Sequence, residues 1–328
     1  MRKTILILIA ALLLVPSCKR MPLYNKEANI DLELELDLDL ELELDLDIDV
    51  DIELEAATIK VPEYLKTNFF SPATGDLQYS QFVGPEGGQL SLGPGRYIML
   101  IYSFGTEYVQ VRGENNLNTI EAFTSDITAS KMKTLEKFYK NNTKADELQD
   151  PIIYAPDHLL VTVQEVEIPE FSGVSQTITI SSQVKTIVDT YIFEVHTVVG
   201  AEYIESAEAF VTNQASSSFF GRGEVNPTPA TICFPVGVDK EKGCLYTVFN
   251  TFGKLPGESD AFLHILVRDT GGNEYEFSTD ITDQFEKPDN HIIIEEPVDI
   301  PEPEAAGSGG IAPTVDPWNE EKEDVPIG

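Results

Sequence analysis

The sequence predicts an all-β protein made of two antiparallel β-sandwich domains. Most of the chain consists of short aliphatic and aromatic runs separated by Gly- and Pro-rich turns, as in "FVGPEGGQLSLGPGRYIMLIYSFG", which is typical of hairpins. Residues 31–55 alternate strictly between acidic and aliphatic side chains. This period of two fits a strand and would scatter leucines around a helix. A single stretch, 130–142, has apolar residues at helical spacing and predicts one short helix.

The chain is strongly acidic, and two terminal segments carry much of the charge. The 22 basic and 56 acidic residues give a formal charge of −34. The alternating segment 31–55, called the acidic ribbon below, supplies 13 of the acids, and residues 295–328 supply ten against one lysine. Nucleic-acid binding needs clustered Lys and Arg, so we expect no nucleic-acid partner.

The N-terminus has the features of a bacterial lipoprotein signal. Arg2 and Lys3 precede an apolar run, 4–15, which is too short to span a bilayer. It ends in "LVPSC", which resembles a lipobox with Cys18 as the acylated residue. The alternative is an ordinary signal peptide with an incidental cysteine. Acylation would anchor the protein to a membrane without inserting the chain through it.

Two further cysteines, Cys233 and Cys244, lie in β-type runs separated by the turn-rich "VGVDKEKG". Export would place them in a compartment that permits disulfides, so a bridge between neighbouring strands is one expectation and two buried thiols are the other. No histidine pattern accompanies them, which disfavours a metal site or a thiol nucleophile.

The elements are expected in the following order. Residues 1–17 form the signal peptide, 18–44 an acidic tether, 45–170 the first sandwich, 171–294 the second, and 295–328 an extended acidic tail. In the first sandwich, strands are expected at 59–65, at 96–102 and within "EYVQVRG", with turns at Gly87-Gly88 and Gly93-Pro94-Gly95. In the second, "DAFLHILVRDTGGNEYEFSTDIT" predicts a hairpin that turns at 269–272.

The acidic ribbon is too long for one strand, since strands are usually about 5–6 residues long. It contains no turn residue, and a self-hairpin would place carboxylates opposite one another. We expect its end, near 45–55, to be the first strand of the first sandwich and its beginning to be a self-repelling tether. A slip of two residues would bury an equivalent leucine, so the register would be weakly specified. Calcium binding is a rival function, although same-face carboxylates on a strand lie too far apart to wrap one ion.

No catalytic pattern is present in the sequence. The four histidines are scattered, and no nucleophile elbow, zinc-protease or phosphate-loop motif occurs. We therefore expect a protein that is not an enzyme and carries no cofactor or metal. An alternative to a structural role is a surface protein that binds a glycan or another ligand through an aromatic platform of Tyr102, Phe104 and Tyr108.

Several stretches, including "CKRMPLYNKEANIDLELELD", "GGQLSLGPGRY", "YAPDHLLV" and "GGIAPTVDPWNEE", resemble a family of Bacteroidales lipoproteins that is similar to fimbrillin-like and minor-fimbria anchor proteins. The resemblance implies two tandem transthyretin-like (fimbrillin-like) β-sandwiches and a lipid-anchored, surface-exposed protein of the outer membrane. It also implies a role as a fimbria anchor or accessory subunit, or as an adhesin.

The resemblance further implies that fimbrillin-type subunits are partners through strand addition. Shaft subunits of such fimbriae lose their first strand to an arginine-specific protease. No arginine lies between Arg20 and Arg96, so a retained first strand fits an anchor or terminal subunit. The tail "TVDPWNEEKEDVPIG" is either a donor strand or an acidic end whose Trp318 packs locally.

Overall fold

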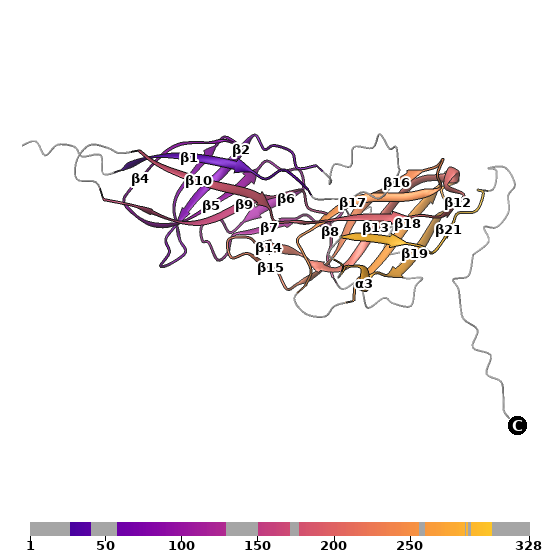
Figure 1. Cartoon of the computed structure of the whole chain (residues 1–328). Coiled ribbons are helices and arrows are strands. Elements are labelled where there is room, and N and C mark those ends of the chain that lie inside the picture. Colours follow the sequence, from indigo (N-terminus) through magenta and orange to yellow (C-terminus); the bar gives the residue numbers. More distant parts are fainter. Residues whose placement is uncertain are drawn as a thin grey trace, which may run out of the picture.

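The computed structural model describes residues 27–40, 58–128, 150–170, 177–255, 260–285, 287 and 290–303. These residues form an elongated molecule in which two β-modules lie end to end (Figure 1). Strands dominate the described chain and the helix α3 (Thr282–Phe285) is a single turn, so the all-β prediction is confirmed. No described helix is long and apolar enough to cross a membrane.

The first module is built around a seven-stranded sheet in the order β3-β2-β5-β9-β10-β1-β4. Its strands are β1 (Ala28–Leu36), β2 (Tyr64–Phe70), β3 (Leu77–Val83), β4 (Gly87–Leu92), β5 (Gly95–Phe104), β9 (Leu160–Ile168) and β10 (Thr177–Thr186). The edge strands β3 and β4 are joined by a tight turn closed by reciprocal hydrogen bonds between Gly84 and Gly87. The sheet therefore curls until its two edges meet around an apolar core.

The second module is an eight-stranded sheet with the path β19-β18-β13-β16-β17-β11-β20, and β8 pairs with β16 beside that path. Its strands are β8 (Ile152–Tyr154), β11 (Asp189–Val195), β13 (Ile204–Ala215), β16 (Pro229–Asp239), β17 (Cys244–Thr251), β18 (Phe262–Asp269), β19 (Glu274–Asp280) and β20 (His291–Ile294). Two short strands, β12 (Val198–Val199) and β21 (Val298–Asp299), pair separately in parallel.

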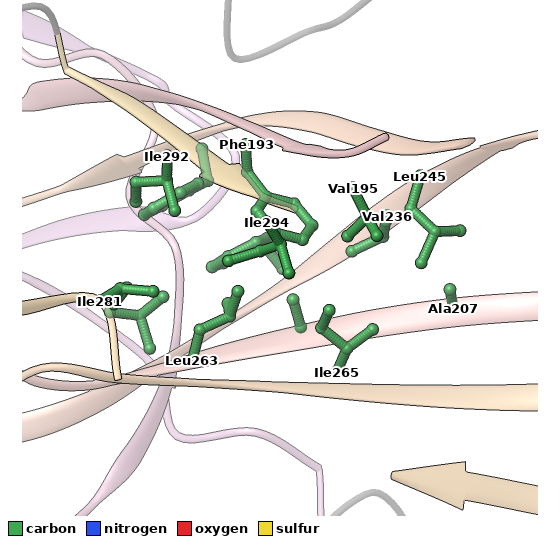
Figure 2. Close-up of a cluster of buried hydrophobic side chains, with 14 of the residues drawn as sticks. Phe193, Val195, Ala207, Val236, Leu245, Leu263, Ile265, Ile281, Ile292 and Ile294 are labelled. Carbon is green, nitrogen blue, oxygen red and sulfur yellow. The ribbon is translucent and has the colours of Figure 1, made fainter. Parts of the chain in front are cut away.

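The sheet of the second module folds over a large apolar core. Side chains from distant strands converge there, among them Phe193, Leu263 and Ile292, each fully buried (Figure 2). At Phe234 and Phe249, rings from β16 and β17 stack 4.1 Å apart with nearly parallel planes. Burial of apolar side chains on this scale is the main stabilising contribution to such a fold.

A four-stranded sheet ties the two modules together. Its order is β15-β14-β7-β6, with the strands β6 (Val109–Arg112), β7 (Glu121–Thr124), β14 (Ser217–Phe219) and β15 (Glu224–Val225). Two of these strands come from each half of the chain. An apolar cluster beneath them joins Tyr102 of β5 to Phe220 and Phe252 of the second half, so the modules share a buried interface.

The expected domain boundaries are corrected by this strand exchange. β10, expected in the second sandwich, completes the sheet of the first. β8, expected in the first sandwich, pairs with β16 of the second, and β14 pairs with β7. The second module also continues past residue 294, because β21 pairs with β12 and Ile300 is buried in the core. Composition and turn signals locate strands, whereas these pairings depend on long-range contacts.

The acidic ribbon enters the sheet at its beginning. β1 lies within the expected tether, so that expectation is wrong for residues 28–36: Ala28, Ile30 and Leu32 are buried, whereas Glu33 and Glu35 are exposed. Leu38 and Leu40 pack against Ile59, Leu160 and Val184. The strand expected near 45–55 lies outside the described residues, as do the helix expected at 130–142, the signal peptide and residues 304–328.

We predict that Ile30→Ala destabilises the first module by about 2–5 kcal/mol, because it removes a fully buried side chain of the core without refilling the space. Urea unfolding followed by circular dichroism measures this loss. The control Glu35→Ala changes an exposed side chain of the same strand and should stay within about 0.5 kcal/mol of the parent. Equal free energies of unfolding for Ile30→Ala and the parent would contradict the observed docking of β1.

Candidate functional site

The described residues contain no group of three or more His, Cys, Asp or Glu side chains arranged to hold a metal ion. The candidate functional features are therefore surfaces: the slot that holds β1, and a groove between the two modules. Each is built from residues that are far apart in the sequence.

The slot of β1 lies between two strands of different origin. β1 pairs in parallel with β10, from Asn29 opposite Thr177 to Leu36 opposite Val184, and antiparallel with β4. Both edges of β1 are thus hydrogen-bonded, and its apolar face joins the core. Removing β1 would leave two strand edges unpaired and open that core, which is the arrangement that accepts an added strand.

Gly87 allows β4 to approach β1 closely. Its φ of +105° lies in a region that residues with a side chain rarely adopt. A Cβ atom there would lie 1.8 Å from the carbonyl oxygen of Leu32, which no small rearrangement could relieve. The "GPEGG" turn that the sequence predicts is therefore also a structural requirement of the β1 slot.

Exposed apolar side chains gather at one place beside the module boundary. Seven large hydrophobic side chains are exposed in the described chain. Five of them, each 41–60% accessible, lie near this boundary: Val61, Tyr64, Phe82, Phe104 and Tyr108. We call these five residues the aromatic patch. Tyr64 and Phe104 stand opposite each other on β2 and β5, and the Phe82 and Phe104 rings meet edge to face at 5.1 Å. Contiguous exposed apolar surface marks interaction sites.

The aromatic patch borders a groove with a volume of about 1070 Å³. Segments 58–64, 103–108 and 154–158 line it on the side of the patch, and residues 233–237 of β16 and 247–250 of β17 line it from the second module. The groove forms where β16 changes partner: β8 pairs with residues 231–233 and β17 with residues 237–239. Ligand sites commonly occupy such junctions between domains.

A partly buried cluster of polar side chains holds the β5 wall in place behind the patch. Glu114 accepts hydrogen bonds from the Lys66 ammonium at 2.6 Å and from the Tyr102 hydroxyl. Burial opposes ionisation of Glu114, but the bonds from Lys66 and Tyr102 outweigh it and hold the pKa of the carboxyl below its usual value. Burial, together with Glu114, raises the pKa of Tyr102 above its ordinary range, so this phenol stays protonated and donates.

A second polar network joins the two halves of the chain. The buried carboxylate of Glu121 on β7 accepts two hydrogen bonds from the Arg112 guanidinium and one from the Ser217 hydroxyl of β14, and the Asn226 amide also donates to it. Burial disfavours the charge, but the bonds from Arg112 and Ser217 prevail and lower the pKa of Glu121. The network therefore depends on ionised Glu121.

The residues predicted from the sequence have different outcomes. Cys18 lies outside the described residues. Cys233 and Cys244 are both buried but are not bridged to each other, so the expected disulfide is wrong. Strand β16 runs on to Asp239, which pairs with Cys244. This places Cys233 six residues away along the strand, or roughly 20 Å, whereas a disulfide needs the Cα atoms within about 7 Å.

The expected aromatic platform is partly present. Phe104 and Tyr108 are half-exposed, as a binding platform requires, but Tyr102 is fully buried. Sequence reasoning missed Tyr64, Phe82 and Val61. Strand pairing brings Tyr64 opposite Phe104, the Phe82 ring contacts that of Phe104, and Val61 lines the same groove. The sequence predicted a strand at 59–65, whereas β2 runs from Tyr64 to Phe70, and the predicted strands gave no sign that their outward faces meet.

These features define an all-β protein with two interlocked modules, an internal strand slot and an apolar groove as its candidate functional surfaces. A family model described as a domain of unknown function, DUF5119, matches residues 39–235, which is more than half of the chain. The chain therefore belongs to the DUF5119 family.

Similar named and solved proteins come from Bacteroidales. The chain is 23% identical over 309 residues to a Bacteroides ovatus protein named "Putative fimbrium anchoring subunit Fim4B", covering 82% of this chain and 86% of the relative. A crystal structure from Bacteroides ovatus described as a "putative adhesin" is 18% identical, with a TM-score of 0.58 over 85% of this chain and 94% of that one.

The fimbrial anchor protein Mfa2 from Porphyromonas gingivalis has a TM-score of 0.42 at 12% identity, covering 78% of this chain and 82% of that one. The relative named as a fimbrium anchoring subunit confirms the likeness to fimbrial proteins of Bacteroidales that the sequence predicted, and the solved adhesin shares the fold.

We predict that acidification weakens the contact between the two halves of the chain through Glu121. Its pKa is lowered in the folded protein, so its contribution is complete above the unfolded value of about 4.3 and is lost as the pH falls through the lower folded value. At neutral pH, Glu121→Gln should cost roughly 1–3 kcal/mol, and this difference should shrink toward zero in acid.

Thermal unfolding between neutral and acidic pH measures this effect. The control Glu165→Gln alters a carboxylate that is 77% exposed and 4.0 Å from Arg96, and exposed pairs contribute little. A cost for Glu121→Gln that is constant across this pH range would show that the carboxylate charge is not what joins the two halves.

Proposed function

We propose that this protein is a lipid-anchored surface lipoprotein of the outer membrane and that it anchors a fimbrium or serves as its accessory subunit. The observation that carries the proposal is the likeness to a named fimbrium anchoring subunit over 82% of the chain. The interlocked all-β modules support a structural role, and we infer that the protein is not an enzyme.

The position of β1 supports the assignment as an anchor. β1 fills its own slot in the first module. No arginine lies between Arg20 and Arg96, so an arginine-specific protease has no site at which to release the strand. A first module that keeps β1 has a filled sheet, so it cannot accept a strand from a neighbouring subunit at that position. Association with fimbrillin-type subunits would then use another strand, for which the tail 314–328 is the candidate donor.

Acylation at Cys18 would hold the first module close to the membrane. Nine residues, 19–27, separate Cys18 from Ala28 at the start of β1. Even fully extended, this span reaches about 30–35 Å. The tether is therefore much shorter than the 18–44 segment expected from the sequence, and a load on the fimbrium would pass directly into the slot of β1.

We predict that Cys18→Ser releases both the protein and its fimbriae from the cell. The substitution removes the thiol that carries the lipid, so the protein should move from the outer-membrane fraction to the medium. Immunoblots of the two fractions, with fimbrial subunits probed in parallel, measure this redistribution. Ser17→Ala, which leaves the acylated residue in place, is the matched control.

Two results would count against the proposal. If the protein leaves the cell while the fimbriae stay attached, it does not anchor them. If Cys18→Ser leaves the protein in the membrane and mass spectrometry finds no lipid on Cys18 in the parent, the mode of attachment is wrong.

A further inference from the structure

We propose that the groove between the modules is a binding site for a neutral oligosaccharide, which is a function beyond anchoring. The groove joins the aromatic patch to polar side chains at the module boundary. The ligand would pack the C–H faces of its sugar rings on the exposed aromatic rings and hydrogen-bond its hydroxyls to the carboxylates of the walls.

The exposed rings are held rigidly. Tyr64 and Phe104 lie on adjacent strands at directly paired positions, and Phe104 is fixed by its edge contact with Phe82. On the same side of the groove, the Tyr108 ring lies 5.6 Å from that of Tyr154, and the backbone N–H of Tyr108 donates to the Asp157 carboxylate. Rings that are already ordered lose little entropy on binding.

The charge of the groove disfavours other occupants. Its acidic and basic side chains are Lys60, Glu63, Glu107, Asp157 and His158, so carboxylates outnumber lysine three to one. A phosphate, an acidic polysaccharide or an acidic protein surface would be repelled. A second copy of this chain carries a formal charge of −34, and residues 304–328 hold six acids against one lysine. Neither is a suitable occupant.

A neutral ligand is favoured over a cationic peptide. Two of the three carboxylates are already engaged, since Asp157 accepts the Tyr108 N–H and Glu63 interacts with the Tyr64 hydroxyl, and Lys60 adds a positive charge. Strand addition is disfavoured as well, because residues 247–250 of β17 and Val236 of β16 are buried where they line the groove. An added peptide strand needs an exposed edge.

The test uses the purified intact protein and a panel of neutral gluco-, galacto- and manno-oligosaccharides in isothermal titration calorimetry. At least one should bind, and Tyr64→Ala and Phe104→Ala should each weaken that binding by about ten-fold or more, because each removes a ring that contacts the sugar. Val163→Ala, a similarly exposed side chain on β9 of the same sheet, should leave binding unchanged. Thermal unfolding checks that the variants remain folded.

Ionic strength separates the alternatives. Binding of a neutral sugar should not change between low and high salt, because no net charge is neutralised. No binding across the panel would overturn the proposal, as would binding that both ring variants leave intact. If Tyr64→Ala and Phe104→Ala instead abolish association with fimbrial subunits and no sugar binds, the groove is a protein interface and the proposal is wrong. None of these results depends on whether the protein anchors a fimbrium.

Discussion

The structure depends on the pairing of β1 with β10 and β4. These pairings join residues of the acidic ribbon to a strand nearly 150 positions later and to a hairpin between them. They complete the seven-stranded sheet, close its core and leave the acids of β1 facing water. Since β10 continues within two residues into β11 of the second module, the slot of β1 also fixes where the second module begins.

The two modules are interlocked rather than merely consecutive. Each half of the chain contributes strands to the other: β14 extends the sheet of β7, β8 extends that of β16, and Glu121 is held by groups from both halves. A force applied along the molecule would have to break ladders and a buried charge network together. The groove is a consequence of the same exchange, because it opens where β16 passes from β8 to β17.

Sequence reasoning predicted the strand content, several hairpins and the family likeness, because alternation and turn residues are local signals. It failed where distant residues decide the outcome. Every segment of the acidic ribbon satisfies the same alternation, so the pattern alone did not indicate which part docks. Ala28 supplies the missing signal: it is fully buried, so a slip of two residues would place either Ile30 or Lys26 in its space. Such a slip would overpack the core or bury a charge. The cysteine pairing was predicted wrongly and the aromatic patch only in part, because both depend on contacts between residues that are distant in the sequence.

Hydrogen–deuterium exchange of the backbone amides in β1 tests the central claim most directly. If β1 is an integral strand of the first module, its amides should exchange as slowly as those of β10, in a single protected segment that starts near Ala28. If the amides of residues 29–36 exchange as fast as those of an unfolded chain while β10 stays protected, the acidic ribbon does not complete the sheet and the account fails.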